Sequence, residues 1–115
     1  MSHPIVHVDI TGPQEAPLHE FYAELLGWEV RPMGPGYALV STPDGSPDGA
    51  LVEGEQAGVT IGVAVPDLAA AVANAERIGG SVVMPPTDNG WVHKAQVTDP
   101  AGNVLTLIED AARAD

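Results

Sequence analysis

The sequence predicts an α+β domain made of two copies of a βαβββ unit, at about 4–54 and 58–110 of its 115 residues. The sequence pattern predicts a strand, a helix and three strands, and this order occurs twice. Each copy ends in an apolar strand whose last residue is an acid, Glu53 or Glu109. Length agrees, because 115 residues make one compact domain (1–115) and are too few for two independent ones. Self-similarity at about half the chain length indicates a duplicated unit.

The elements of the first copy follow from its hydrophobic periodicity. Residues 4–11 are rich in β-branched side chains and predict a strand. Residues 15–26 place apolar side chains at helical spacing, and Gly27 is a stop signal for that helix. Three strands are expected to follow, at 28–33, 36–43 and 50–54.

The second copy begins again with a strand at 59–65, and Asp67 is expected to cap a helix over 68–80. The two copies are in register, because GWEV at 27–30 lies over GSVV at 80–83, an offset of 53 residues. The remaining strands are expected at 81–86, 91–100 and 104–109.

One helix in each copy can cover only one face of its strands. We therefore expect the open faces to curl around a common hollow, so that a curved mixed sheet forms a half-barrel cup around a central cavity. Polar side chains on strands that are otherwise nearly continuously apolar become candidates for function. These candidates are His7, Asp9, Glu53, Thr60 and Glu109.

Composition excludes several classes of partner. Sixteen acids against four Lys plus Arg give a net charge of −12, which would repel nucleic acid. The same charge would attract a cationic small molecule, or it serves solubility alone. The absence of cysteine excludes disulfides and thiol chemistry. No apolar run reaches the roughly 18 residues of a membrane span, and no signal peptide is recognisable, so a cytoplasmic protein is expected.

The segments ELLGWEV, VAVPDLAAAVANAERIGGSVVMPP and TDPAGNVLTLIE, taken in this order, resemble the vicinal oxygen chelate superfamily. That superfamily contains glyoxalase I, extradiol dioxygenases, and the fosfomycin-resistance and bleomycin-resistance proteins. The resemblance covers residues 4–110 and implies the duplicated fold. It also implies a homodimer, since members commonly pair.

The resemblance places metal ligands on the first and last strands of each copy, here at His7, Glu53, Thr60 and Glu109. Thr60 departs from the pattern, because most metal-dependent members have histidine there. A set of His7, Glu53 and Glu109 is able to hold Ni, Co, Mn, Fe or Zn, with Thr60 bonded to a metal-bound water. The resemblance then implies a lyase or isomerase in which Glu109, or alternatively Glu53, moves a proton beside a metal-bound oxygen.

Further side chains are candidates for contact with the substrate. Tyr37 and Trp91 occupy matching places in the two copies and could stack on a flat ligand or pack in the core. His93 could line the cavity or lie on a polar strand face. Thr60 and Asp9 complete this group.

Three functions remain open. One is the metal-dependent lyase or isomerase, and another is a metal-free protein of the bleomycin-resistance type that binds a drug or metabolite. The third is an accessory or regulatory domain with an unused cup. Phosphate-bearing substrates and coenzyme A thioesters are disfavoured, because the four cationic side chains form no cluster in the sequence.

Overall fold

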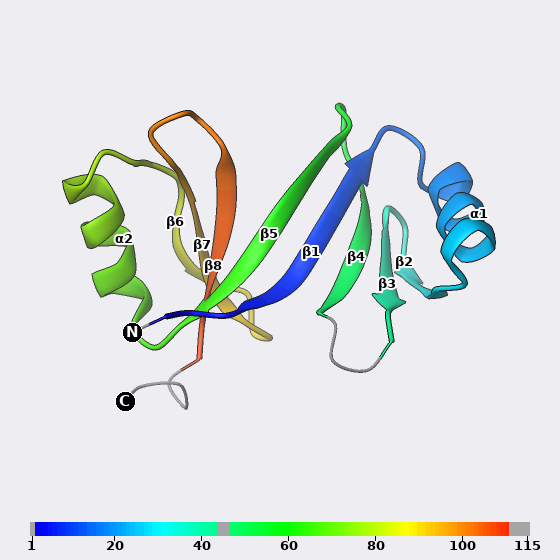
Figure 1. Ribbon diagram of the computed structural model, residues 1–115, viewed down its shortest axis with the longest axis horizontal. Helices are drawn as coiled ribbons and strands as arrows, with labels where there is room; N and C mark the ends of the chain where they lie inside the picture. The colour runs from blue at the N-terminus through cyan, green and yellow to red at the C-terminus, as the bar shows by residue number, and fades with distance from the viewer. Residues whose placement is uncertain (1, 44–46, 111–115) are drawn as a thin grey trace. The chain divides into compact units, whose positions relative to one another are not determined.

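The computed structural model describes residues 2–43 and 47–110. The chain divides into two compact units. We call Val6–Thr60 the N-terminal unit, and we call Ile61–Asp115 together with Met1–Ile5 the C-terminal unit. Each has one helix and four strands. Figure 1 shows each helix beside the strands of its own unit. The predicted fold class, α+β with tandem βαβββ repeats, is confirmed.

The strands of the N-terminal unit lie in the order β2-β3-β4-β1. The first strand and the last, β1 and β4, pair in parallel, and the other pairs are antiparallel, so the sheet is mixed as predicted. The elements are β1 (Ile5–Gly12), α1 (Glu15–Leu26), β2 (Glu29–Gly34), β3 (Tyr37–Ser41) and β4 (Asp48–Glu53).

The C-terminal unit repeats this topology. Its strands lie in the order β5-β8-β7-β6, with the same parallel pair between first and last strand. The elements are β5 (Gly58–Val65), α2 (Leu68–Arg77), β6 (Ser81–Asp88), β7 (His93–Thr98) and β8 (Val104–Glu109). Among the described residues no helix is long and apolar enough to cross a membrane.

The two helices begin differently. The Asp67 carboxylate accepts a hydrogen bond from the Ala70 amide at 3.1 Å, so the predicted cap of α2 is confirmed. At α1 the N-cap residue is Gln14, whose side chain makes no capping bond. The end of α1 is as predicted, because Gly27 adopts the left-handed conformation (φ 72°) that favours glycine. Helix α2 ends three residues earlier than expected, at Arg77.

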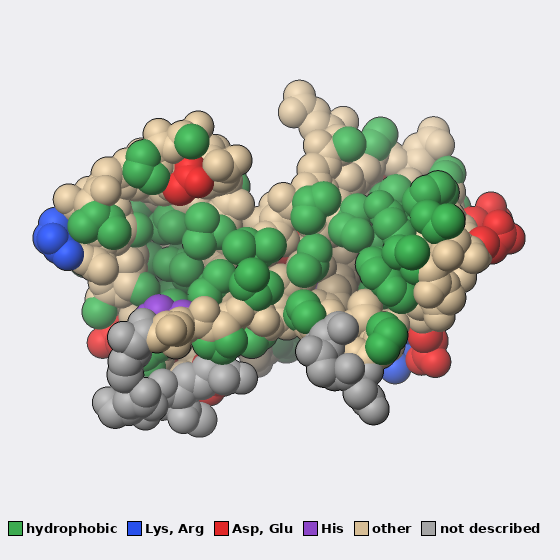
Figure 2. All heavy atoms as spheres, in the orientation of Figure 1, with side chains coloured by type: hydrophobic (Ala, Val, Ile, Leu, Met, Phe, Trp, Pro, Cys, Tyr) green, Lys and Arg blue, Asp and Glu red, His purple; other side chains and the backbone are tan. Residues whose placement is uncertain are grey.

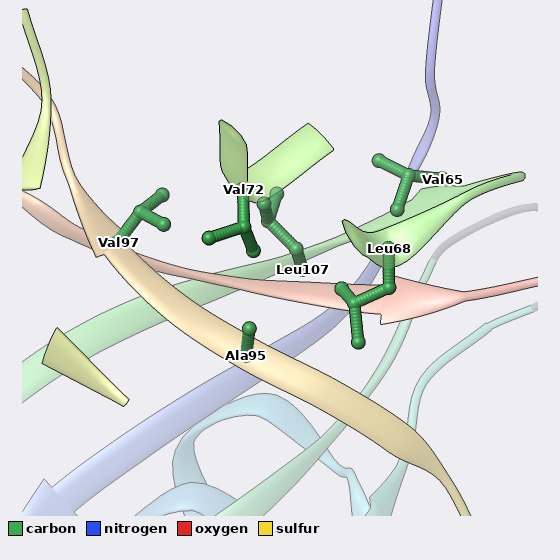
Figure 3. Packing of buried hydrophobic residues seen from close by; sticks show 6 residues of the cluster. All are labelled: Val65, Leu68, Val72, Ala95, Val97 and Leu107. Carbon is green, nitrogen blue, oxygen red and sulfur yellow. The ribbon is translucent and has the colours of Figure 1, made fainter. Parts of the chain in front are cut away.

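Each unit has its own core, on the face of the sheet against which its helix packs. In the C-terminal unit six buried side chains interlock, as Figure 3 shows: Val65, Leu68, Val72, Ala95, Val97 and Leu107. The core of the N-terminal unit is smaller and centres on Ala38, Val40 and Leu51, with Leu18 and Tyr22 of α1 packed on it. We call these sides the helix-covered faces and the opposite sides the open faces.

The first residues of the chain belong structurally to its second half. The Pro4 carbonyl accepts a hydrogen bond from the Ala64 amide at 3.0 Å. This bond attaches the start of the chain to β5 within the C-terminal unit. The boundary between the units therefore differs from the repeat boundary, which the sequence predicts near residue 58.

Candidate functional site

Two polar side chains on the open face of β1 are bonded to each other. Nε2 of His7 donates to Oδ1 of Asp9 at 2.8 Å, and the two side chains are 25% and 28% exposed. They share a face because side chains alternate along a strand. Since a carboxylate only accepts, Nε2 of His7 carries a proton in this hydrogen bond. The strand therefore presents an oriented imidazole beside a carboxylate.

Tyr37 contributes a phenol to the same open face. It pairs across β3 and β4 with Val52, while Asp9 pairs across β1 and β4 with Ala50. Burial raises the pKa of the Tyr37 hydroxyl, and the charge of Asp9 raises it further. The phenol therefore stays protonated at neutral pH and is able to donate a hydrogen bond. We call His7, Asp9 and Tyr37 the open-face cluster.

Glu53 lies at the other end of the parallel strand pair. It is in register with Gly12, whereas His7 is in register with Asp48. Five residues of strand separate these positions, which is about 16 Å. Glu53 also shares the alternation of Leu51 in the core, so it stands on the helix-covered face. The sequence predicted it on the open face, and the register places it on the opposite one.

Glu109 is tied to the start of α2. Oε2 of Glu109 accepts from the Leu68 amide at 2.9 Å, and Oε1 accepts from Nδ1 of His93 at 3.0 Å. The Leu68 amide, and after it the His93 ring, hold the pKa of this carboxyl below its usual value. Glu109 follows the alternation of buried Leu107, so it too lies on the helix-covered face, where the sequence predicted the open face.

The predicted metal ligands do not fit a shared ion in this arrangement. His7 and Glu53 are about five strand positions apart and on opposite faces, whereas both donors of one metal lie about 2 Å from it. Both oxygens of Glu109 are already hydrogen-bonded. The described residues contain no group of three or more His, Asp or Glu side chains that could hold a metal ion.

Two polar residues on the open face of the C-terminal unit, Gln96 and Thr106, were not predicted from the sequence. Nε2 of Gln96 donates to the Thr106 hydroxyl at 3.2 Å, and Thr106 is buried. Thr106 is paired with Gly62 of β5. Half-buried Thr60 is two residues before Gly62 on the same strand, so Thr60, a predicted site residue, lies on the same face of the sheet as Thr106. The signal was available in VLTLIE, because Leu105 and Leu107 as core residues leave Thr106 on the open side.

The two remaining candidates lie apart from the open faces. His93 follows the alternation of buried Ala95 and Val97 and is paired with Glu109 on the helix-covered face. The Trp91 side chain is 82% exposed, and it precedes β7 in a turn that the Asn89 side chain holds by bonds to two amides. Neither Trp91 nor half-buried Tyr37 belongs to a described core cluster.

Comparison with known proteins agrees with the topology. A family model described as a glyoxalase-like domain matches residues 6–108. A comparison of the sequence with curated proteins found no match. Among solved structures, a glyoxalase/bleomycin resistance protein/dioxygenase superfamily member from Vibrio splendidus 12B01 is similar, with TM-score 0.72 and 18% identity. That match covers 95% of this chain and 100% of the other.

Two similar structures are epimerases by title. The methylmalonyl-CoA epimerase from Mycobacterium tuberculosis has TM-score 0.71 and 19% identity, with coverage of 93% of this chain and 87% of that one. A methylmalonyl-CoA epimerase from Streptomyces coelicolor has TM-score 0.67 and 21% identity, and coverage is 95% of both chains. At such identity the likeness shows a shared fold.

Proposed function

Because the chain belongs to the glyoxalase-like domain family, we propose that it binds a small, positively charged organic molecule on the open face of its N-terminal unit. The single observation that carries the proposal is the open-face cluster, in which the Asp9 carboxylate is hydrogen-bonded to the His7 imidazole and its charge raises the pKa of the Tyr37 phenol. A carboxylate attracts a cation directly, and an aromatic ring attracts it through its face.

The charge of the whole chain supports the same ligand class. A net charge of −12 draws cations toward the surface and repels anions. Of the described cationic side chains, only exposed Arg31 lies on a strand of this unit. Phosphates and coenzyme A thioesters therefore remain disfavoured as ligands, although two structures with this fold are methylmalonyl-CoA epimerases by title.

Calorimetric titration with benzyltrimethylammonium tests this proposal, with benzenesulfonate as an anionic probe of similar size. We expect the cation to bind and the anion not to bind. Asp9→Asn should weaken binding of the cation at least tenfold. Glu24→Gln removes the same charge from an exposed position on α1, on the other side of the sheet, and it should change affinity less than twofold. Equal effects of the two variants, or equal binding of the two probes, would refute a specific site.

The second candidate is a divalent-metal-dependent lyase or isomerase that moves a proton beside a metal-bound oxygen. His7 favours it, because this imidazole stands on the open face and its Nδ1 makes no hydrogen bond to another described residue. The positions of Glu53 and Glu109 weigh against it. Titration of the parent and His7→Ala with Ni, Co, Mn, Fe and Zn distinguishes the two functions. Stoichiometric metal bound only by the parent would favour the lyase or isomerase.

A further inference from the structure

The N-terminal unit contains an apolar hollow on its helix-covered face. Its volume is about 260 Å³, and Val8, Ile10, Trp28, Val40, Pro43 and Pro47 line it. Val40 belongs to the core and Ile10 and Trp28 pack against it, which places the hollow on the side opposite the open-face cluster. Figure 2 shows hydrophobic side chains gathered over the part of this unit around α1 and β1.

We propose that this hollow is a binding site for a small, uncharged aromatic molecule of one or two rings. An apolar cavity of about 150 Å³ stays dry and accepts benzene. The volume of 260 Å³ leaves room for a somewhat larger guest. It is slightly below the range of pockets that hold drug-sized ligands, so a larger molecule would not be enclosed.

The lining restricts the ligand to an uncharged one. None of the described residues that line the hollow has a charged side chain. The Thr42 hydroxyl, the one hydroxyl among these described residues, donates to the Pro47 carbonyl at 2.8 Å. A polar guest would lose its bonds to water here and find little to replace them, which disfavours it.

Two features keep the hollow from closing. A side chain at Gly49 would meet the Val8 carbonyl oxygen at 2.6 Å, so this position of the lining has to stay without one and leaves the hollow unfilled. On another side, the Trp28 ring is stacked on Tyr22, with centroids 5.5 Å apart and planes 10° from parallel. This stacking holds an aromatic wall in place, and aromatic rings pair favourably with aromatic guests.

Toluene is the probe, with benzoate as its charged counterpart. The background is Trp91→Phe, which leaves Trp28 as the only tryptophan. We expect toluene to change Trp28 fluorescence in a saturable way and to raise the melting temperature, and we expect benzoate to do neither. Val8→Phe fills the hollow and should weaken toluene binding at least tenfold. Val104→Phe makes the same change at an exposed position of β8 and should leave toluene binding unchanged.

The proposal remains testable if the filling variant folds poorly. Val8→Leu fills less of the hollow and should weaken toluene binding by a smaller factor. Circular dichroism checks the fold of each variant. Failure of toluene to bind the parent, or equal binding by Val8→Phe, would overturn the site. Sedimentation showing that self-association covers the hollow and abolishes toluene binding would overturn it as well. Because the open-face cluster is unaltered in these variants, failure here leaves the cation proposal standing.

Discussion

In the N-terminal unit Glu53 ends β4 opposite Gly12, and in the C-terminal unit Glu109 ends β8 opposite Val65. The two acids occupy equivalent places in the two repeats. The Glu109 carboxylate binds the first amide of α2 and the His93 ring. The carboxylate of Glu53 is exposed and makes no hydrogen bond to another described residue. The two repeats therefore share strand register, but the acids at equivalent positions make different hydrogen bonds.

The helices and cores differ in the same sense. Helix α2 starts with the Asp67 cap as well as the Glu109 contact, and it covers a core of six buried residues. Helix α1 has no side-chain cap, its core has three buried residues, and an apolar hollow remains beside it. We therefore expect the C-terminal unit to be the more stably packed one, while the N-terminal unit has room for ligands.

The largest effects should come from the two fully buried leucines. Leu68→Ala should lower the free energy of unfolding by about 3–5 kcal/mol, because its neighbours are closely packed and relax little. Leu51→Ala should lower it by about 2–3 kcal/mol, because it lies in the smaller cluster. Urea denaturation of both variants measures the difference. A larger loss at Leu51 would contradict the comparison.

Removal of a helix cap should have a smaller effect. Asp67→Ala leaves the Ala70 amide without its acceptor and should destabilise the protein by about 1 kcal/mol. Asp67→Asn retains an acceptor oxygen and serves as the control, with less than half that loss. The midpoint of urea denaturation reports both. An equal loss in Asp67→Asn would mean that charge, rather than the capping bond, is responsible.

Addition of a cap to α1 should produce a gain of similar or smaller size. Gln14 has the extended backbone of an N-cap residue (φ −136°, ψ 119°) and no capping bond. Gln14→Ser should therefore stabilise the protein by about 0.5–1 kcal/mol without changing its charge. Gln14→Ala is the matched control and should produce no gain. Thermal denaturation of the two variants decides the matter, and a destabilised Gln14→Ser would show that α1 starts elsewhere.

The pH dependence of stability should reveal the Glu109 contact. Its folded pKa is lower than the usual value of 4.5, so folding favours the charged form. The contribution is complete above pH 4.5 and is lost as the pH falls through the lowered folded value. Glu109→Gln should therefore lower the melting temperature at pH 7 and show a flatter decline below pH 4.5. Glu53, whose carboxylate makes no hydrogen bond to another described residue, provides the control, and Glu53→Gln should lower the melting temperature at pH 7 less than Glu109→Gln does.

Sequence reasoning located the elements better than the faces. The helix at 15–26 was predicted to the residue, because apolar spacing and the Gly27 stop coincide. Strand ends differ from the prediction by at most two residues, as where β4 begins at Asp48 and β6 extends to Asp88. Backbone pairing with neighbouring strands decides these ends, and a single strand's sequence does not contain that information.

The faces could not be read reliably from nearly continuous apolar strands. In VLTLIE either Thr106 or Glu109 marks a polar side, and the two positions have opposite alternation. The acid at the strand end predicts Glu109 on the open face, but packing of Leu105 and Leu107 against α2 assigns it to the helix-covered face. His7 and Asp9 were placed correctly together, because β1 alternates clearly between apolar and polar residues.

The bond between Pro4 and Ala64 limits how the duplicated chain can be divided. Cleavage after Thr60 would leave the first five residues on the wrong fragment, because they complete the half that lies beyond the cut. If the two halves were expressed separately, the N-terminal half would carry a segment that has no place to pair. The C-terminal half would lack the segment around Pro4 that bonds to β5. In such a tandem repeat one end of the chain completes the other copy, so a cut at the repeat boundary does not yield two intact modules.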